Sequence, residues 1–331
     1  MLKVNIQFEN IKEKRVITKS KNSNLHTAKK EKNDEFYTQI SDIEKELGNY
    51  KNYFKGKIVF CNCDDPEESN FWNYFALNFE YLGLKRMVST HYEIDKPSYK
   101  LELVADINKD GKINKLDTIK TPLKQNGDFR SQECIDILEE ADIVVTNPPF
   151  SLFREYIAQL VQYNKKFLVI GNMNAITYKE IFSFIKDNKV WLGVSPRSMN
   201  FKLPDNSETC VNACWFTNLH HKKRNDELIL YKKYNEKDYP KYDNYDAINV
   251  DKVKDIPMDY FETIGVPITF LDKFNPEQFE IVSCNDYRKV EGIPFKGHGL
   301  IKDKHGTING KPKYVRILIK NKRATQQQVI I

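Results

Sequence analysis

Continuous apolar runs alternate with amphipathic segments over the first two thirds of the chain, and this alternation constrains the fold most. Six runs are rich in β-branched and aromatic residues, at 56–63, 85–92, 142–146, 165–172, 190–194 and 212–219. Between most of them lie segments with helical spacing of apolar residues. Strands that are apolar on both faces and joined through helices form a mostly parallel sheet with helices on both sides. The pattern therefore predicts a Rossmann-like, doubly wound α/β fold, and the last two runs, joined without a helix, predict an antiparallel pair at one edge of the sheet, with one antiparallel edge strand.

The size and composition of the chain limit the classes of protein that it can be. Its 331 residues are 40% hydrophobic and 30% charged, which predicts a globular protein of about two domains. No apolar run approaches the roughly 18 residues that a membrane span needs, and the first residues show no signal-peptide pattern. We therefore expect a cytoplasmic protein with no membrane association. The six cysteines are expected to be free thiols rather than disulfides or zinc ligands.

A change of composition near residue 231 predicts the domain organisation. Residues 1–23 carry mixed charges without a clear pattern, and we expect an N-terminal arm there. The strand–helix alternation indicates an α/β domain over residues 24–230. Residues 231–331 are rich in Tyr, Lys, Asp and Asn at first and show no helical pattern, which predicts a separate C-terminal region of mixed α+β structure.

Basic residues are concentrated near the end of the chain, although the net charge is only +6. One acid, Asp303, stands among nine basic residues: Lys296, Lys302, Lys304, Lys311, Lys313, Arg316, Lys320, Lys322 and Arg323. A local excess of this kind is typical of proteins that bind a phosphate backbone. In "YVRILIKNK" the apolar residues alternate with polar ones, so we expect a strand with Arg316 and Lys320 on a basic face.

The stretch "IVVTNPPFS", from Ile143 to Ser151, carries the clearest chemical signal. A strand that reads as fully buried ends at Asn147, Pro148, Pro149 and Phe150, and ligands bind at the carboxyl ends of strands in doubly wound sheets. The Asn147 side-chain oxygen and the Pro148 carbonyl are two acceptors, Pro149 stiffens the turn, and Phe150 offers a flat face. This arrangement would hold an exocyclic amino group and stack its ring, as a nucleobase removed from its stack requires.

The motif and its surroundings resemble a known family. An [ND]-P-P-[YFW] motif after the fourth strand is similar to the catalytic motif of S-adenosylmethionine-dependent amino-group methyltransferases. Further segments resemble the EcoRI-type adenine-N6 DNA methyltransferases over about residues 24 to 323, among them "LHTAKKEKNDEFYTQISDIEKEL", "VFCNCDDPEESNFWNYFALNF", "YPKYDNYDAINVDKVKDIPMDY" and "GVPITFLDKFNPEQFE". The resemblance implies a catalytic domain over 24–230 and a DNA target-recognition region over 231–331.

The resemblance also implies roles for individual residues. Asn147 and Pro148 would accept the two protons of adenine N6, and Phe150 would stack on the flipped base. Methyl transfer would be direct, without a covalent enzyme intermediate, so catalysis would rest on positioning and electrostatics. The cofactor would be S-adenosylmethionine and the substrate double-stranded DNA. A restriction endonuclease that acts separately on the same DNA is a further implied partner, and one flipped base requires only a monomer.

Six residues are candidates for the cofactor site. Tyr37 and Thr38 in "DEFYT" would contact the methionine end, and Asp64 in "CNCDDP" would lie near its amino or carboxyl group. The latter turn has no glycine, where methyltransferases at large have a glycine-rich one. Glu93 would bind the ribose hydroxyls, and Asp128 and Phe129 in "GDF" would contact the adenine of the cofactor.

The resemblance and the basic pattern together give the DNA-binding candidates, which are Arg197, Lys311, Lys313, Arg316, Lys320 and Arg323. Arg197 lies in the loop between two late strands and is expected near the flipped base, with an ordinary surface arginine as the alternative. Two other functions remain open for the whole chain. One is a methyltransferase acting on RNA or on a protein amide, and the other is a non-catalytic DNA-binding protein that kept the fold.

The segment "DINKDGKINKLD" fits the spacing of a calcium-binding loop. Its candidate ligands are Asp106, Asn108, Asp110, Asn114 and Asp117. The preceding residues alternate like a strand rather than an entering helix, and "NKDG" is a good hairpin turn. We therefore expect a polar hairpin insertion and no metal site.

Overall fold

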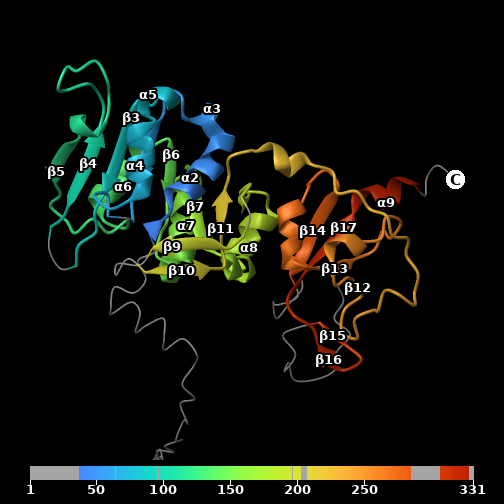
Figure 1. Ribbon diagram of the computed structural model, residues 1–331. Helices are drawn as coiled ribbons and strands as arrows, with labels where there is room; N and C mark the ends of the chain where they lie inside the picture. The colour runs from blue at the N-terminus through green and yellow to red at the C-terminus, as the bar shows by residue number, and fades with distance from the viewer. Residues whose placement is uncertain are drawn as a thin grey trace, which may run out of the picture. The chain divides into compact units, whose positions relative to one another are not determined.

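An eight-stranded sheet is the largest sheet among the described residues of the computed structural model, in the strand order β5-β4-β3-β2-β6-β7-β11-β8. Figure 1 labels β5, β4, β3, β6, β7 and β11 of this sheet. The structure describes residues 37–63, 65–94, 97–195, 197–202, 207–284 and 306–327. Four inner strands of the eight-stranded sheet pair in parallel. They are β3 (Arg86–Thr90), β2 (Ile58–Cys61), β6 (Ile143–Thr146) and β7 (Lys166–Asn172). The predicted parallel sheet is thus confirmed.

The last two predicted strands form the expected antiparallel pair at one edge of the sheet, but the outermost strand runs in the same direction as the parallel strands, so the prediction of one antiparallel edge strand is wrong in its position. β11 (Ala213–Thr217) pairs antiparallel with β7 on one side and with β8 (Trp191–Leu192) on the other. All five residues of β11 are buried, and their backbone groups find partners on both sides, whereas β8 contributes only two residues. The short strand therefore occupies the edge.

The polar insertion after β3 extends the opposite edge of the sheet. β4 (Tyr99–Leu103) and β5 (Ile119–Pro122) form an antiparallel hairpin, and β4 pairs antiparallel with β3. The predicted hairpin is confirmed. Its pairing with β3 was not predicted, because a hairpin turn in the sequence does not show which neighbour the strands will find.

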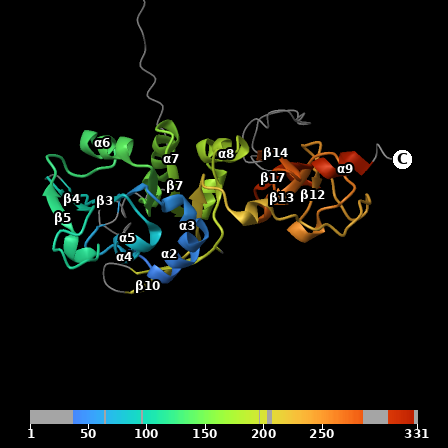
Figure 2. The same ribbon diagram turned by 90° about the horizontal axis from the view of Figure 1, so that it is seen from above.

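Helices cover both faces of the sheet, as Figure 2 shows from above. One face packs on the N-terminal helices, α2 (Ile40–Leu47), α3 (Lys51–Phe54), α4 (Asn70–Leu77) and α5 (Phe79–Leu82). The other face packs on α6 (Gln132–Glu140), α7 (Phe153–Gln162) and α8 (Lys179–Lys186). Along β2, Val59 and Cys61 belong to the first core and Phe60 to the second. The continuous apolar runs therefore reflect burial on both sides.

The C-terminal residues form a smaller sheet in the order β12-β13-β17-β14. Its strands are β12 (Ile248–Asn249), β13 (Ile264–Pro267), β17 (Arg316–Asn321) and β14 (Phe279–Cys284). A separate hairpin joins β15 (Thr307–Ile308) to β16 (Lys311–Pro312), and α9 (Lys322–Gln327) follows β17. Residues 35–331 form one compact unit, so the boundary at residue 231 stays a prediction, and the expected arm lies outside the described residues.

The expected strand near the C-terminus exists as β17, but its predicted basic face is wrong. Leu318 is fully buried against Tyr242 and Tyr245, on the face opposite to Ile317 and Ile319. Arg316 is also buried, at 9% exposure, and only Lys320 of the strand is exposed. The strand is central in its sheet and covered on both faces, a tertiary effect that its alternation alone could not reveal.

A third, three-stranded sheet brings distant segments of the chain together. β9 (Met199–Lys202) pairs antiparallel with β10 (Glu208–Val211) and with β1 (Tyr37–Thr38). In this register Thr38 lies opposite Phe201. The pairing joins the beginning of the described chain to the hairpin that follows β8.

Candidate active site

The Asn-Pro-Pro-Phe motif begins directly after β6, at the carboxyl end of a central strand. β6 lies between β2 and β7, and all three run parallel, so their carboxyl ends meet at one edge of the sheet. Asn147 is 6% exposed, whereas the Phe150 ring is half-buried. The motif therefore lies at the edge where doubly wound sheets bind their ligands.

Two buried hydrogen bonds tie the end of β6 to the end of β2. The Thr146 hydroxyl donates to the backbone carbonyl of Asn62, and the Tyr156 hydroxyl of α7 donates to the Asn62 side-chain oxygen. All three residues are at most 3% exposed. Burial raises the pKa of Tyr156 well above its ordinary value, so the phenol stays protonated and can donate. The residue before Asn147 is thus fixed relative to the turn after β2.

That turn explains how the chain manages without a glycine-rich sequence. Cys63 adopts a left-handed conformation with φ 76°. Glycine usually fills such positions, because a Cβ atom is crowded there. The thiol of Cys63 is partly buried against the core of the α6–α8 face, which ties the strained residue to the fold. Asp64, the next residue and a cofactor candidate, lies outside the described residues.

We expect Cys63→Val to be less stable than Cys63→Gly by about 1–2 kcal/mol, because a β-branched residue tolerates positive φ poorly. Chemical denaturation of the two variants would measure the difference. Equal unfolding free energies would contradict the strained conformation at this position.

An aromatic pair links the motif to the three-stranded sheet. The Phe150 ring meets the Phe201 ring edge-on, with centroids 6.5 Å apart and planes at 84°. Phe201 is fully buried in β9, and this edge-to-face geometry is a favourable one for two rings. Sequence patterning did not identify Phe201, because the two phenylalanines are 51 residues apart and only the β-hairpin brings them together.

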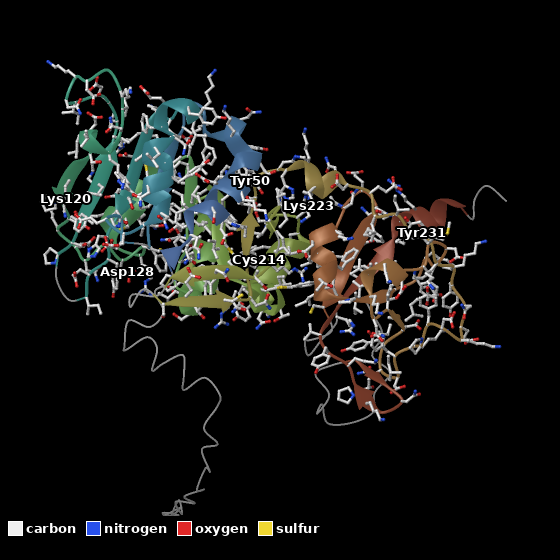
Figure 3. The ribbon with its side chains drawn as sticks, in the orientation of Figure 1. Tyr50, Lys120, Asp128, Cys214, Lys223 and Tyr231 are labelled. Carbon is white, nitrogen blue, oxygen red and sulfur yellow. The ribbon has the colours of Figure 1, made fainter. Side chains whose placement is uncertain are left out.

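The cofactor candidate Glu93, after β3, lies close to the segment that leads to the candidates Asp128 and Phe129. The backbone N–H of Glu93 donates to the Asn126 carbonyl at 2.9 Å. Gly127 has φ 77°, and a Cβ at this position would lie 1.9 Å from the His91 backbone oxygen. Glycine therefore allows the "GDF" segment to approach the end of β3, and Asp128 lies at the same end of the sheet as the β9–β10 hairpin (Figure 3).

Asp128 and Phe129 have clear contacts within the protein. The Asp128 carboxylate forms an ion pair with Arg130, with Nη2 and Oδ2 2.6 Å apart. Phe129 is 6% exposed and packs edge-on against Tyr156 at 5.1 Å. Thr38 is almost fully buried, and nothing is described of the Tyr37 side chain. The predicted roles of these residues toward a cofactor stay predictions.

Gly127→Ala should lower the unfolding free energy by about 1–3 kcal/mol more than Gly111→Ala does, since an added Cβ would meet backbone that cannot move aside. Gly111 also has positive φ, at 87°, but a Cβ there would meet nothing within 4 Å. The pair separates the steric effect from the cost of the dihedral angle. Thermal or chemical unfolding provides the measurement, and equal losses would show that the close approach at His91 is absent.

A polar cluster beside these residues was missed in the sequence. The His91 ring stacks on Tyr99 with centroids 4.8 Å apart, and its Nε2 lies 3.7 Å from the Asp65 carboxylate. The Tyr99 hydroxyl donates to Asp65 at 3.2 Å, and burial followed by the Asp65 charge raises the pKa of Tyr99. Asp65 and His91 follow neighbouring parallel strands, and this adjacency is the signal that would have paired them.

Comparison with known proteins decides the family. The family model for the adenine-specific methyltransferase EcoRI matches residues 24–322. The chain is 49% identical to the Type II methyltransferase M.EcoRI of Escherichia coli over 91% of this chain and 97% of the relative. It is 41% identical to the Type II methyltransferase M.MpnI of Mycoplasma pneumoniae over 90% of this chain and 98% of the relative.

The chain belongs to the EcoRI family of adenine-specific methyltransferases. The predicted activity, that of a site-specific adenine DNA methyltransferase, is thereby confirmed. The alternatives of an RNA or protein-amide methyltransferase and of a non-catalytic DNA-binding protein are set aside. Within this EcoRI-family chain, the edge of the sheet that carries the Asn-Pro-Pro-Phe motif is the candidate active site.

The basic residues predicted to bind DNA in this EcoRI-family chain fall into two groups. Arg316 donates to Asp251 at 3.0 Å, the Lys313 ammonium lies 3.8 Å from the same carboxylate, and Arg323 forms an ion pair with Glu227. Arg197 forms an ion pair with Asp272. Lys311 and Lys320 are exposed.

Ion pairing changes what the first group can offer to DNA. Arg197 and Arg316 have side chains that are only 13% and 11% exposed, so little of either guanidinium faces solvent. Hydrogen bonds, first from Asn249 and then from Arg316, lower the pKa of Asp251, which keeps this carboxylate charged beside the arginine. Lys311 and Lys320 are therefore the better-placed phosphate candidates in the EcoRI-family chain.

The Asp106–Asp117 loop of this EcoRI-family chain satisfies its acidic groups with its own backbone. Asp106 accepts from the N–H groups of Asp110 and Gly111, and the 1% exposed Asp117 accepts from Ile107, Asn108 and Asn114. Within the described ranges no group of three or more His, Cys, Asp or Glu side chains is arranged to hold a metal ion.

Two further expectations concern thiols and membranes. None of the six cysteines of the EcoRI-family chain forms a disulfide among the described residues. In the part of the chain that the structure describes, no helix has both the length and the apolar character to cross a membrane.

Proposed function

We propose that this chain transfers a methyl group from S-adenosylmethionine to N6 of an adenine that has been flipped out of duplex DNA. The observation that carries the proposal is the position of Asn147, Pro148 and Phe150 after the central strand β6, with the Phe150 ring braced by Phe201. Asn147 is only 6% exposed, and a base cannot present its amino group to this side chain while it is stacked in the duplex, so flipping is the required step.

The chain's residues act on the target base by holding it. The Asn147 side-chain oxygen and the Pro148 carbonyl accept the two N6 protons, which directs the nitrogen lone pair away from the base plane. Phe150 stacks on the base and fixes its rotation. Neither contact requires a covalent bond to the enzyme, so the rate depends on how well these groups are positioned.

The residues around β1 and β3 fit a polar, adenine-containing cofactor. The Thr38 Oγ1 atom is buried and has no hydrogen-bond partner among the described residues, so a bound ligand could supply one. Glu93 and Asp128 would supply further acceptors beyond the carboxyl end of β3, where the segment at 126–128 approaches the chain. When bound, S-adenosylmethionine would supply an electrophilic methyl group.

Thr38→Val is expected to weaken the binding of S-adenosylhomocysteine by about 0.5–1.5 kcal/mol, through loss of one hydrogen bond. Because the hydroxyl has no partner within the described protein, the melting temperature without ligand should not fall. Thr217→Val is the matched control: its hydroxyl donates to the Phe167 carbonyl at 2.6 Å, so it should lose stability and keep its affinity. Calorimetric titration with S-adenosylhomocysteine would measure the affinity of both variants. An unchanged affinity in Thr38→Val would show that the cofactor site does not include this hydroxyl.

Residues 231–331 would form the DNA target-recognition region and residues 24–230 the catalytic domain. The exposed Lys311 on β16 and Lys320 on β17 would contact phosphates, with Lys313 and Arg323 available when their acidic partners release them. The protein would act as a monomer in the cytoplasm. A separate restriction endonuclease that recognises the same sequence would be the functional counterpart.

Long-read sequencing of genomic DNA from cells that express the chain tests this proposal. The expected result is N6-methyladenine at one position of one short sequence, absent from cells that carry the empty vector. Methylation scattered without a shared sequence, or found only in RNA, would contradict the assignment.

A further inference from the structure

An ion pair lies between the segment that joins β8 to β9 and the residues that follow β13. Between β8 and β9 the structure describes residues 193–195, 197 and 198, and Arg197 forms an ion pair with Asp272, with Nη2 and Oδ2 2.7 Å apart. Asp272 belongs to the 3-10 helix η7 (Ile268–Lys273), which directly follows β13 of the C-terminal sheet. The ion pair therefore links the loop before β9 to the sheet that we assign to DNA recognition.

The ion pair is held in a protected place. The Arg197 side chain is 13% exposed and that of Asp272 is 33% exposed, and the Nε and Nη2 atoms of Arg197 are shielded from solvent and make no aligned hydrogen bond among the described residues. Water screens such a pair less than one at the surface, so the charge attraction between the two side chains is stronger than at an exposed site. A displacement of Asp272 would therefore displace Arg197 with it.

Strand β9, which follows Arg197, contacts the ring that we assign to the target base. β9 begins at Met199, two residues after Arg197, and it places Phe201 edge-on against Phe150. The same strand pairs with β1, where Thr38 lies opposite Phe201. A shift of β9 would thus move the support of the ring that stacks on the flipped adenine.

We propose that the Arg197–Asp272 ion pair is a positioning device that couples DNA bound on the C-terminal sheet to the stacking surface of Phe150. The inference rests on the proposed function, because it assumes that the C-terminal sheet holds DNA and that Phe150 holds the base. Arg197 then acts through β9 and not by touching DNA, which agrees with its burial.

The loop has a second anchor that makes the proposal testable. The fully buried Glu46 of α2 accepts hydrogen bonds from the backbone N–H groups of Val194 and Ser195, at 2.8 and 2.6 Å. Lys223 also donates to the Val194 carbonyl at 3.0 Å. These contacts hold the first half of the loop without the ion pair, so removal of both charges should leave the fold intact.

The test compares wild-type protein with the double variant Arg197→Met/Asp272→Leu, which removes both charges and leaves neither one buried alone. The control is Arg86→Met/Glu102→Leu, a pair with side chains 23% and 14% exposed on β3 and β4. Four quantities are measured. The first three are the melting temperature, the affinity for S-adenosylhomocysteine and the single-turnover methylation rate. The fourth is the fluorescence of 2-aminopurine that replaces the target adenine in a duplex with the recognition sequence.

The expected result is a double variant that melts near the wild-type temperature and binds S-adenosylhomocysteine as well. Its methylation rate should fall by about tenfold, with a matching loss of 2-aminopurine emission, while the control keeps both. A folded double variant with wild-type rate and emission would overturn the proposal, because the pair would then only stabilise the fold.

Phe201→Leu decides the question if the double variant does not fold. This substitution keeps an apolar side chain under Phe150 but removes the ring edge, and it should lower the emission and the rate without changing the affinity for S-adenosylhomocysteine. Wild-type emission and rate in Phe201→Leu would overturn the coupling through β9. A wild-type protein that transfers no methyl group would instead contradict the proposed function itself.

Discussion

Asn147→Ala is expected to lower the single-turnover methylation rate by about 100- to 1,000-fold, the usual cost of losing one positioned polar group at a reacting centre. The substitution removes one of the two acceptors for adenine N6 and leaves the Pro148 carbonyl in place. Binding of duplex DNA and of S-adenosylhomocysteine should change little, since neither depends on this oxygen in our account. Quenched-flow kinetics with labelled cofactor would provide the rate.

The matched control for this variant is Asn52→Ala, an exposed asparagine on α3 that lies outside the candidate site. It should keep the wild-type rate. An Asn147→Ala protein that methylates DNA as fast as the control would remove Asn147 from the reaction, whatever the position of its side chain.

Glu46→Ala is expected to produce the largest loss of stability, about 3–5 kcal/mol of unfolding free energy. Glu46 is fully buried, and its carboxyl oxygens accept from Val194, Ser195 and the Tyr50 hydroxyl. Alanine would leave three donors without this acceptor, the buried Tyr50 hydroxyl and the part-buried N–H groups of Val194 and Ser195. The Glu46 Oε1 atom also occupies the space that a Cβ atom of residue 193 would fill if this residue were not glycine. The Glu46→Ala substitution therefore leaves a gap beside Gly193 as well.

Glu44→Ala provides the comparison, because Glu44 is exposed on the same helix. Denaturant titrations of the two variants should give clearly different midpoints with similar slopes. If Glu46→Ala unfolded at the same midpoint as Glu44→Ala, the loop at 193–198 would not be anchored as we describe.

The sequence predicted the features that depend on local pattern. The parallel centre of the sheet, its helices on both faces and the position of the Asn-Pro-Pro-Phe motif follow from apolar runs of strand length that alternate with amphipathic helices. The hairpin at β4 and β5 followed from an alternating strand, although the turn sequence "NKDG" that suggested it lies inside the longer connection at 104–118. Each of these requires only neighbouring residues.

Features that depend on tertiary contacts could not be predicted from the sequence. Glu46 reads as one acid among several on an amphipathic helix, yet it is the buried anchor of a loop about 150 residues later. Arg316 reads as part of a basic face, yet an acid from a different segment pairs with it on a covered strand. The place of β11 inside the sheet depends on which strand edge remains available, and no local pattern records that.

The turn after β2 lacks the glycine that methyltransferases at large have there, and the structure shows which residue takes its place. The absence of glycine in "CNCDDP" separated this chain from methyltransferases at large. Cys63 nevertheless adopts the left-handed conformation, and the Thr146–Asn62–Tyr156 contacts hold the turn against the active-site strand. A fixed glycine pattern therefore describes one way to build this turn, and a well-supported non-glycine residue is another.

Mass spectrometry of nucleosides from duplex DNA that has been incubated with the purified protein and S-adenosylmethionine tests the central claim most directly. The account predicts N6-methyladenine from the wild-type protein and about 100-fold less from Asn147→Ala at equal times. Methylated cytosine in place of N6-methyladenine, or equal amounts of N6-methyladenine from both proteins, would contradict it.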